Sequence, residues 1–511
     1  MADETVLRVA TCLAAAGYSA EVEDLAGLSR SLWGDLQLWG AHRLHQGPGG
    51  RSHLMYSARA GHTARVAFLL GAGAAQALTD ARGMTALLHA SFTGSSETAT
   101  LLLDAGADTG AVAGVGLTSL LFACNKGHRE MVALLLRRGA SVEDACLSGA
   151  GSDNTGCDCS TLMMAGKQGH LDVVRLLVEQ GADVSREVQC GNALCSAIRS
   201  GSMDLVQFLL EAGAPAGGAP SQRQPLSVAA DLGQDAIVTA LLQRGADTEA
   251  EDMGGRTPLM RASASGHTST VRLLCTAGGA EVDAQSEAGS FTALMLACRE
   301  GHVDTVEELL RMEADVDMAK PCGCTAMSLA ALNGHAGCVA ALLEAGAEHS
   351  PESECSSPLA LACAGPHLQA ARLLLQAGAQ AAAPGPEECE LLMHACARGQ
   401  VDMVRLLVEV GEMDASSALE SGLAPLHIAA QEGETGCLLA LLELGADVDA
   451  TESGSLCTPL MAAARAGNQE CVWELLQAGA NKQARDSRGR TAWRLAKDQG
   501  SLTAAVRKLL R

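Results

Sequence analysis

Apolar residues recur along this chain in paired helical runs, with a period near 33 residues. One unit is "TPLMRASASGHTSTVRLLCTAG" (257–278), and "TALMLACREGHVDTVEELLRMEAD" (292–315) has the same parts in the same order. A first apolar run ends at a glycine, and a second run repeats apolar residues at i, i+3 and i+4 before another glycine-rich turn. The pattern predicts two short helices in each unit, joined by tight turns.

The period is steady over fourteen units. Successive first-helix leucines, or their substitutes, are 32 to 35 residues apart, except for one step of 42 residues from Leu120 to Leu162. They are Leu54, Leu87, Leu120, Leu162, Leu194, Leu226, Leu259, Leu294, Met327, Leu359, Leu392, Leu426, Leu460 and Trp493. A single helix pair cannot bury its apolar face alone, so the units are expected to stack on one another.

The ends of the helices can be read from residue type. Thr257 is a good N-cap, because its hydroxyl accepts a backbone N–H bond of the first turn, and Pro258 stands where a missing N–H costs nothing. Gly266, Gly301 and Gly467 follow the first run at positions that suit a positive φ. The sequence therefore predicts that first helices begin at Thr-Pro or Thr-Ala and end at these glycines.

These units resemble the ankyrin repeat, over about residues 53–511. The segment "GLAPLHIAAQEGETGCLLALLELGADVDA" (422–450) carries the resemblance most fully, and a Gly-His pair ends the first helix at His62, His128, His170, His267, His302 and His335. The resemblance implies an all-α fold, a curved α-solenoid of stacked helix pairs with β-hairpin or loop fingers. It also implies that these histidines tie adjacent units together by hydrogen bonds.

The repeat pattern divides the chain into segments. We expect an N-terminal helical segment at 1–46, a joint at 47–52, repeats 1–13 at 53–480 with an enlarged finger at 143–160 and an irregular region at 379–422, and a basic capping repeat at 481–511. The enlarged finger coincides with the 42-residue step, and the irregular region lacks the usual finger turn. We expect a kink or a loosened finger in the irregular region.

The segment 1–46 has helical periodicity around Leu25, Leu28 and Leu32, and contains Trp33 and Trp39. The order of these residues resembles a degenerate F-box, the helical module that docks an adaptor of a ubiquitin ligase. The usual Leu-Pro opening of an F-box is absent, and the spacing from Asp-Leu to Trp is shorter than in that family. A plain pair of capping helices is the alternative.

Composition narrows the classes of function. Aromatic residues make up 2% of the 511 residues and the net charge is −23, which argues against a nucleic-acid footprint and favours a monomer. Residues 481–511 differ, with nine Lys and Arg against two Asp. Acidic residues and Arg8 at the N-terminus do not fit a signal peptide, and no run is long and apolar enough to cross a membrane. The chain is therefore predicted to be intracellular and cytoplasmic, with a nuclear location left open, and its 19 cysteines reduced.

No enzyme motif or cofactor site emerges. The chain lacks G-x-x-x-x-G-K-[ST], H-E-x-x-H and G-x-S-x-G. Most cysteines occupy repeated core slots, such as Cys124 in the first helix and Cys338 in the second, where they act as small apolar residues. The C-x-C pairs that end at Cys159 and Cys324 have no companion ligands for zinc. No enzyme activity, metal or cofactor is predicted.

A long solenoid without catalytic chemistry is typical of a scaffold that binds protein partners along its concave face and fingers. Positions just before the first-helix glycine vary from unit to unit and are the candidate contacts: Arg59, Phe92, Asn125, Lys126, Lys167, Arg199, Asp231, Arg299, Gln431 and Glu432. Phe92 is either an exposed anchor or partly buried against a neighbouring unit. The alternative function is substrate recognition for a ubiquitin ligase, with residues 1–46 docking the adaptor through Leu25, Leu28, Leu32, Trp33 and Trp39.

Overall fold

The fold was analysed in a computed structural model. It describes residues 50–114, 116–146, 159–187, 191–217, 224–286, 289–348, 357–379, 386–499, 508 and 510–511. These residues form 27 helices and no sheet, which confirms the predicted all-α class of stacked helix pairs. The chain divides into two units, Met1–Gly254 and Gly255–Arg511, each a row of helix pairs.

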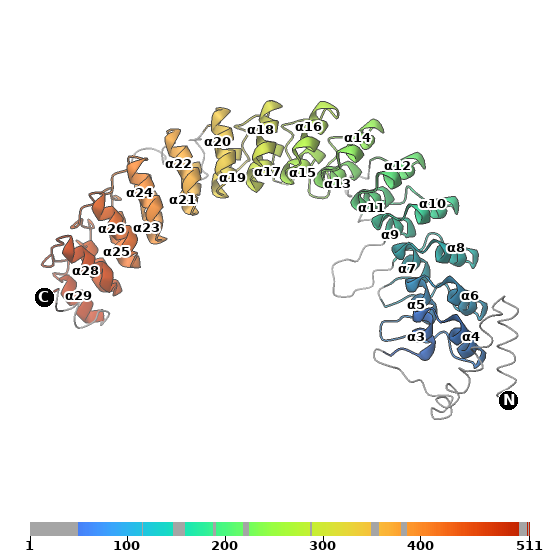
Figure 1. Ribbon diagram of the computed structural model, residues 1–511. Helices are drawn as coiled ribbons and strands as arrows, with labels where there is room; N and C mark the ends of the chain where they lie inside the picture. Colours follow the sequence, from blue (N-terminus) through green and yellow to red (C-terminus); the bar gives the residue numbers. More distant parts are fainter. Residues whose placement is uncertain are drawn as a thin grey trace, which may run out of the picture. The chain divides into compact units, whose positions relative to one another are not determined.

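The N-terminal unit holds the first six pairs. Its helices are α3 (His53–Ala60), α4 (Thr63–Gly71), α5 (Ala86–Thr93), α6 (Ser96–Asp104), α7 (Ser119–Lys126), α8 (Arg129–Arg137), α9 (Thr161–Lys167), α10 (Leu171–Glu179), α11 (Ala193–Ser200), α12 (Met203–Glu211), α13 (Pro225–Asp231) and α14 (Asp235–Gln243). The first helices of the pairs pack on one another along one side of the row, and the second helices follow the other side (Figure 1).

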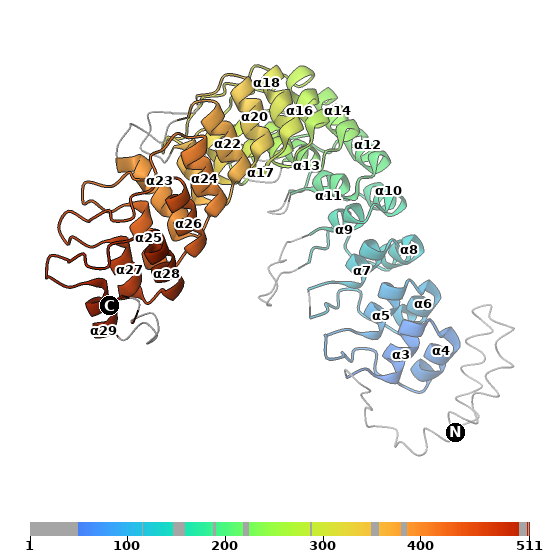
Figure 2. The same cartoon turned by 60° about the vertical axis from the view of Figure 1, so that its left-hand side comes forward.

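The C-terminal unit continues the same pattern and ends with a single helix. Its helices are α15 (Pro258–Ala264), α16 (Thr268–Thr276), α17 (Ala293–Glu300), α18 (Val303–Arg311), α19 (Ala326–Leu332), α20 (Ala336–Glu344), α21 (Pro358–Ala364), α22 (Leu368–Gln376), α23 (Pro386–Ala397), α24 (Val401–Glu409), α25 (Pro425–Glu432), α26 (Thr435–Glu443), α27 (Pro459–Ala466), α28 (Gln469–Gln477) and α29 (Ala492–Gln499). Figure 2 shows the loops of this unit projecting from the ends of the first helices.

The predicted caps begin and end the first helices. The hydroxyl of Thr257 accepts the N–H of Met260 at 3.4 Å, and Pro258 occupies the first helical position. Gly301 ends α17 with φ 85°, in the left-handed region that glycine adopts without strain. Ser52 caps α3 in the same way, although the first repeat lacks a Thr-Pro start. Short helices of seven to nine residues are marginal alone, so the caps and the stacking stabilise them together.

Histidines join neighbouring repeats. The ring Nε2 of His302 lies 3.1 Å from the carbonyl oxygen of Ala264 in the preceding repeat, and His335 makes the same contact with Arg299 at 3.0 Å. His128 bonds to Phe92 in the N-terminal unit at 3.2 Å. The predicted inter-repeat hydrogen bonds are confirmed at these three histidines. Each ring also packs against the glycine that ends the first helix of the preceding repeat, at the place where a Cβ on that glycine would lie. The glycine of one repeat and the histidine of the next therefore form one contact.

The fingers are turns rather than β-hairpins in the described residues. Only two isolated β-bridges occur there, Ala145 with Ser160 and Ala319 with Thr325. Each finger closes through few hydrogen bonds, and neighbouring fingers are linked by single backbone bonds, such as Gly114 N–H to Arg82 O at 2.8 Å. Of the two predicted forms, hairpin or loop, the described fingers are loops, because their backbone bonds, such as Asp80 N–H to Met84 O at 3.0 Å, close single turns and do not continue into a ladder. Loops of this kind present side chains at the edge of the row.

The core is made of small apolar side chains. Leucine, valine, alanine and cysteine fill it, with Cys124, Cys298 and Cys363 fully buried at equivalent first-helix positions. Burial raises the pKa of the Cys363 thiol to about 12, so this side chain is a neutral, apolar filler at physiological pH.

Several predicted segments lie wholly or partly outside the described residues. They are the helical segment 1–46, most of the joint 47–52, residues 147–158 of the enlarged finger, residues 380–385 of the irregular region, and residues 500–507 and 509 of the capping repeat. In the described part of that region α23 has twelve residues, more than the other first helices, and α24 packs against it.

Candidate protein-interaction surface

All ten predicted contact residues lie in the last turn of a first helix. We call the side of each row formed by the first helices and the fingers the first-helix face. Seven of the ten side chains are exposed there: Arg59, Lys126, Lys167, Arg199, Asp231, Gln431 and Glu432. Phe92, Asn125 and Arg299 are half-buried. Residues far apart in sequence thus occur at one repeated position of the fold.

Phe92 is partly buried against the third repeat. Its ring meets the ring of Phe122 edge to face, with 6.0 Å between centroids, and packs on a small cluster that contains Met84 and Leu88. The ammonium of Lys126 lies 4.8 Å from the centroid of the Phe92 ring, within the range of a cation–π contact. The guanidinium of Arg59 lies 6.0 Å from the same centroid. Phe92 therefore joins the first three repeats on the first-helix face.

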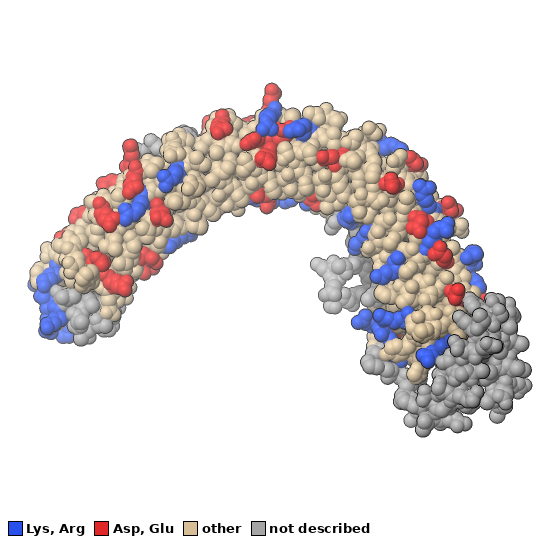
Figure 3. Space-filling view, in the orientation of Figure 1, with Lys and Arg blue, Asp and Glu red and all other residues tan. Residues whose placement is uncertain are grey.

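Four cations follow one another along the first-helix face of the N-terminal unit. We call Arg59, Lys126, Lys167 and Arg199 the basic row. At the last two positions of α3, α5, α7, α9 and α11 there is no carboxylate. In the space-filling view, Lys and Arg gather on this side of the unit, whereas the second-helix side carries both signs (Figure 3). Lys and Arg here form a cationic strip on a chain whose net charge is −23.

The corresponding strip in the C-terminal unit is different in charge. Arg299 forms an ion pair with its neighbour Glu300 at 2.7 Å, and the last turn of α25 ends in Gln431 and Glu432. The guanidinium of Arg299 also lies 5.3 Å from the ring centroid of Phe291, and the ammonium of Lys320 lies 3.6 Å from the same centroid. Sequence reasoning missed Phe291 and Lys320, because both lie in fingers whose separation in space the repeat spacing does not reveal.

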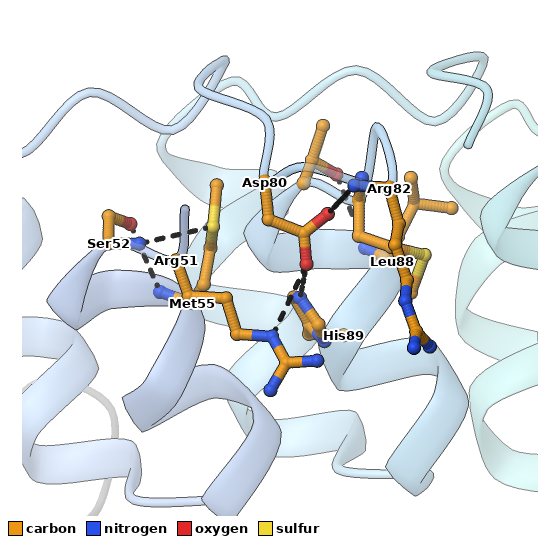
Figure 4. Close-up of polar contacts among 9 residues, drawn as sticks. Arg51, Ser52, Met55, Asp80, Arg82, Leu88 and His89 are labelled. Carbon is orange, nitrogen blue, oxygen red and sulfur yellow. Dashed lines mark hydrogen bonds and ion pairs between the residues drawn. The ribbon is translucent and has the colours of Figure 1, made fainter. Parts of the chain in front are cut away.

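A buried carboxylate holds the first finger of the N-terminal unit in place. Asp80 accepts the N–H groups of Arg82 and Met84, each at 2.9 Å, and contacts Nε2 of His89 at 3.1 Å and Nε of Arg51 at 3.3 Å (Figure 4). Burial opposes ionisation, but these hydrogen bonds hold the pKa of Asp80 below its ordinary value. The exposed Arg82 side chain then projects at the finger tip.

Sequence reasoning also missed this network, although the signal recurs. Asp486 in the last finger accepts the N–H of Arg488 at 3.0 Å and that of Arg490 at 2.7 Å. Both aspartates stand in the pattern D-x-x-G-x-T, which could have identified them. The carboxylates organise the fingers and leave the first-helix face to the variable side chains.

Within the described ranges no group of three or more His, Cys, Asp or Glu side chains is placed to hold a metal ion. Cys159 contacts Cys146, whose sulfur accepts the Cys159 N–H at 3.2 Å. Cys322 is exposed and Cys324 half-buried. No described helix is long and apolar enough to cross a membrane.

Comparison with known families gives a consistent result. The family described as "Ankyrin repeats (3 copies)" matches in overlapping segments from residue 33 to residue 452, and "Ankyrin repeat" matches residues 455–487. The chain belongs to the ankyrin repeat family.

Relatives match only parts of their own length. "Ankyrin repeat and KH domain-containing protein mask-1" of Caenorhabditis elegans is 33% identical over 183 residues, which cover 36% of this chain and 6% of that protein. "Neurogenic locus notch homolog protein 4" of Homo sapiens is 40% identical over 91 residues, 18% of this chain and 4% of that protein. "NF-kappa-B inhibitor alpha" of Sus scrofa is 34% identical over 105 residues, 20% of this chain and 33% of that protein. The chain thus spans a third or less of these relatives.

Among solved structures, the human ASB11 ankyrin repeat domain is similar to this chain at 28% identity. The match covers 50% of this chain and 98% of the ASB11 domain, with a TM-score of 0.32.

Proposed function

We propose that this chain is a non-enzymatic scaffold that binds a protein partner along the first-helix face and the fingers. The observation that carries the proposal is the contrast between two sets of positions. Buried first-helix positions repeat Leu, Ala and Cys, whereas the exposed last turn changes from Arg59 to Lys126, Lys167 and Asp231. A regular core with a variable exposed face suits recognition of another macromolecule, as repeat proteins use their extended surfaces.

The relatives support protein binding in general terms. The name of NF-kappa-B inhibitor alpha describes an action on another protein, through a chain that contains similar repeats. The identity of the partner of the present chain does not transfer from a match of 105 residues. The proposal therefore rests on the fold and on the surface.

Photo-crosslinking tests the proposal directly. Benzoyl-phenylalanine is placed in the full chain at Asn125 or Gln431 on the first-helix face, and at Arg137 or Leu439 on the second helices as matched controls. We expect adducts with a protein from the first-helix positions and few from the controls. Adducts confined to the second-helix positions, or no protein adduct from any position, would overturn the proposal.

The ligase alternative depends on residues 1–46, which lie outside the described residues. It predicts that the full chain retains the F-box adaptor and that replacing Leu28 and Trp33 by alanine abolishes retention. An adaptor pull-down with both chains decides this alternative, and no retention by the wild-type chain would end it. We also propose a monomeric state for the chain alone, which sedimentation velocity measures.

A further inference from the structure

We propose that the basic row of the N-terminal unit binds an acidic, extended segment of the partner protein, with an apolar partner residue against Phe92. The inference rests on the proposed function, because it assigns a partner chemistry to the same face. It names four cationic contacts, Arg59, Lys126, Lys167 and Arg199, and one aromatic contact.

The first argument is uncompensated charge. None of the four cations forms an ion pair with a described carboxylate, and all four are exposed. Other arginines of the same unit are paired, such as Arg138 with Asp104 at 2.7 Å and Arg186 with Glu143 at 3.0 Å. The chain has a net charge of −23, yet none of its described carboxylates lies within ion-pair distance of these four cations. Such a strip complements an acidic surface and steers its approach.

The second argument is continuity. Phe92 contacts both Arg59 and Lys126, which joins repeats one to three. The side-chain amide of Gln168, beside Lys167, donates to Oδ1 of Asn125 at 3.4 Å, which joins repeats three and four. Helices α9 and α11 pack together and bring Arg199 next in line. The contacts therefore form one strip across five repeats.

Spacing then defines the segment that fits. Packed helices lie about 8–10 Å apart, and an extended chain advances about 3.3 Å per residue. One repeat therefore matches about three residues of an extended partner. The expected segment has Asp or Glu at about every third position. The position that faces the second repeat is the exception, because there an apolar residue lies opposite Phe92. The half-buried Phe92 ring lies 4.8 Å from the ammonium of Lys126 and 6.0 Å from the guanidinium of Arg59, so an aliphatic or aromatic partner side chain would find an apolar contact beside two charges.

Nucleic acid fits this strip less well. A nucleic-acid footprint needs a dense field of cations, because phosphates recur every few ångströms along each strand. The basic row offers one cation for each repeat over most of its length. Exposed carboxylates stand nearby on the second helices of the same repeats, at Glu97, Glu130 and Asp172. A single file of cations, beside second helices that carry both signs of charge, favours a narrow acidic peptide over a nucleic acid (Figure 3).

The test is a peptide titration of the full chain. The probe is a fluorescein-labelled peptide of about 15 residues, with Glu at every third position, one Leu at the second contact and Gly or Ser elsewhere. The analogue with Gln in place of Glu is the control peptide. Fluorescence anisotropy measures binding to three proteins: wild type, R59Q/K126Q/K167Q/R199Q, and the matched second-helix variant R65Q/R129Q/R137Q/R175Q.

The two variants lose the same charge from exposed positions of the same unit. Exposed ion pairs contribute modestly, so we expect the basic-row variant to bind at least about fivefold more weakly and the second-helix variant to bind as the wild type does. Circular dichroism checks that both fold. Equal losses in the two variants, equal binding of the Gln analogue, or preferential binding of a single-stranded oligonucleotide through the row would overturn the inference.

Crosslinking from Asn125 separates this inference from the proposed function. An adduct whose partner peptide is acidic, and which disappears in the basic-row variant, supports the inference. An adduct that persists unchanged in that variant contradicts the inference and leaves the scaffold function standing. If no position yields a protein adduct, the scaffold function fails, and the peptide titration still decides whether the row binds acidic segments.

Discussion

The contact between Gly266 and His302 gives a sharp test of how repeats are held together. An added Cβ at Gly266 would lie 2.6 Å from Nδ1 of His302, and the backbone there has φ 75°. Gly266→Ala therefore has two costs. An L residue in the left-handed region costs about 1–2 kcal/mol, and the displaced ring loses its bond to Ala264 O, worth about 0.5–1.5 kcal/mol. We expect a total of about 1.5–3.5 kcal/mol.

Gly279 is the matched control. It has φ 67°, and an added Cβ would meet nothing within 4 Å. Gly279→Ala should therefore cost only the backbone term, about 1–2 kcal/mol. The double variant Gly266→Ala with His302→Ala removes the ring that the methyl group displaces. Its cost should be about 1 kcal/mol less than the sum of the two single variants.

Hydrogen exchange with mass spectrometry is the suitable assay, because long repeat arrays do not unfold in one step. We expect peptides from α15 to α18 to exchange about 30-fold faster in Gly266→Ala, which corresponds to about 2 kcal/mol. Peptides from α25 to α28 should be unchanged. If Gly266→Ala and Gly279→Ala had equal effects, or if the double variant were additive, the histidine contact would not hold the repeats together.

Three further predictions concern the C-terminal unit. Leu309 is fully buried, so Leu309→Ala should cost about 2–5 kcal/mol, whereas Leu332→Ala, at a side chain 45% exposed, should cost about 1 kcal/mol; chemical melts compare the two, and equal losses would contradict the packing argument. Hydrogen bonding by Arg272 lowers the pKa of Glu308 from 4.5 to about 2, so the contribution of Glu308 to stability is present above pH 4.5 and is lost as the pH falls toward 2. Glu308→Gln should therefore reduce the loss of stability between about pH 6 and pH 3 in chemical melts, and an unchanged loss would refute the assignment. Burial lowers the pKa of His427, so the folded state is not destabilised by this residue above its unfolded pKa of about 6.5 and loses stability as the pH falls below that value. His427→Gln should reduce the loss of stability between about pH 7 and pH 5, and an unaltered loss would show that His427 does not titrate there.

The repeated parts of the fold were predictable because each depends on local chemistry. Thr257 and Pro258 begin a helix through one hydroxyl and one missing N–H, and Gly301 ends one through its positive φ. The period then implies stacking, since no pair can bury its own face. Cys124 was correctly read as a core residue because it shares its slot with other cysteines.

The remaining features depend on how side chains of different repeats meet. The sequence places Phe92 at a variable position, but the sharing of its ring by Arg59 and Lys126 follows from the offset between stacked helices. The Asp80 network likewise joins Arg51, which precedes the first repeat, to His89 of the second repeat. The fingers form turns without strands, with only isolated β-bridges in the described residues, and the repeat period does not specify this. These contacts depend on three-dimensional geometry that a periodic pattern does not specify.

The central claim is that a protein partner lies along the first-helix face. Hydrogen exchange of the chain with and without its crosslink-identified partner measures this most directly. We predict protection in the last turns of α3, α5, α7, α9 and α11 and in their fingers, with α4, α6, α8, α10 and α12 unchanged. Protection confined to the second helices, with the first helices unchanged, would contradict the account.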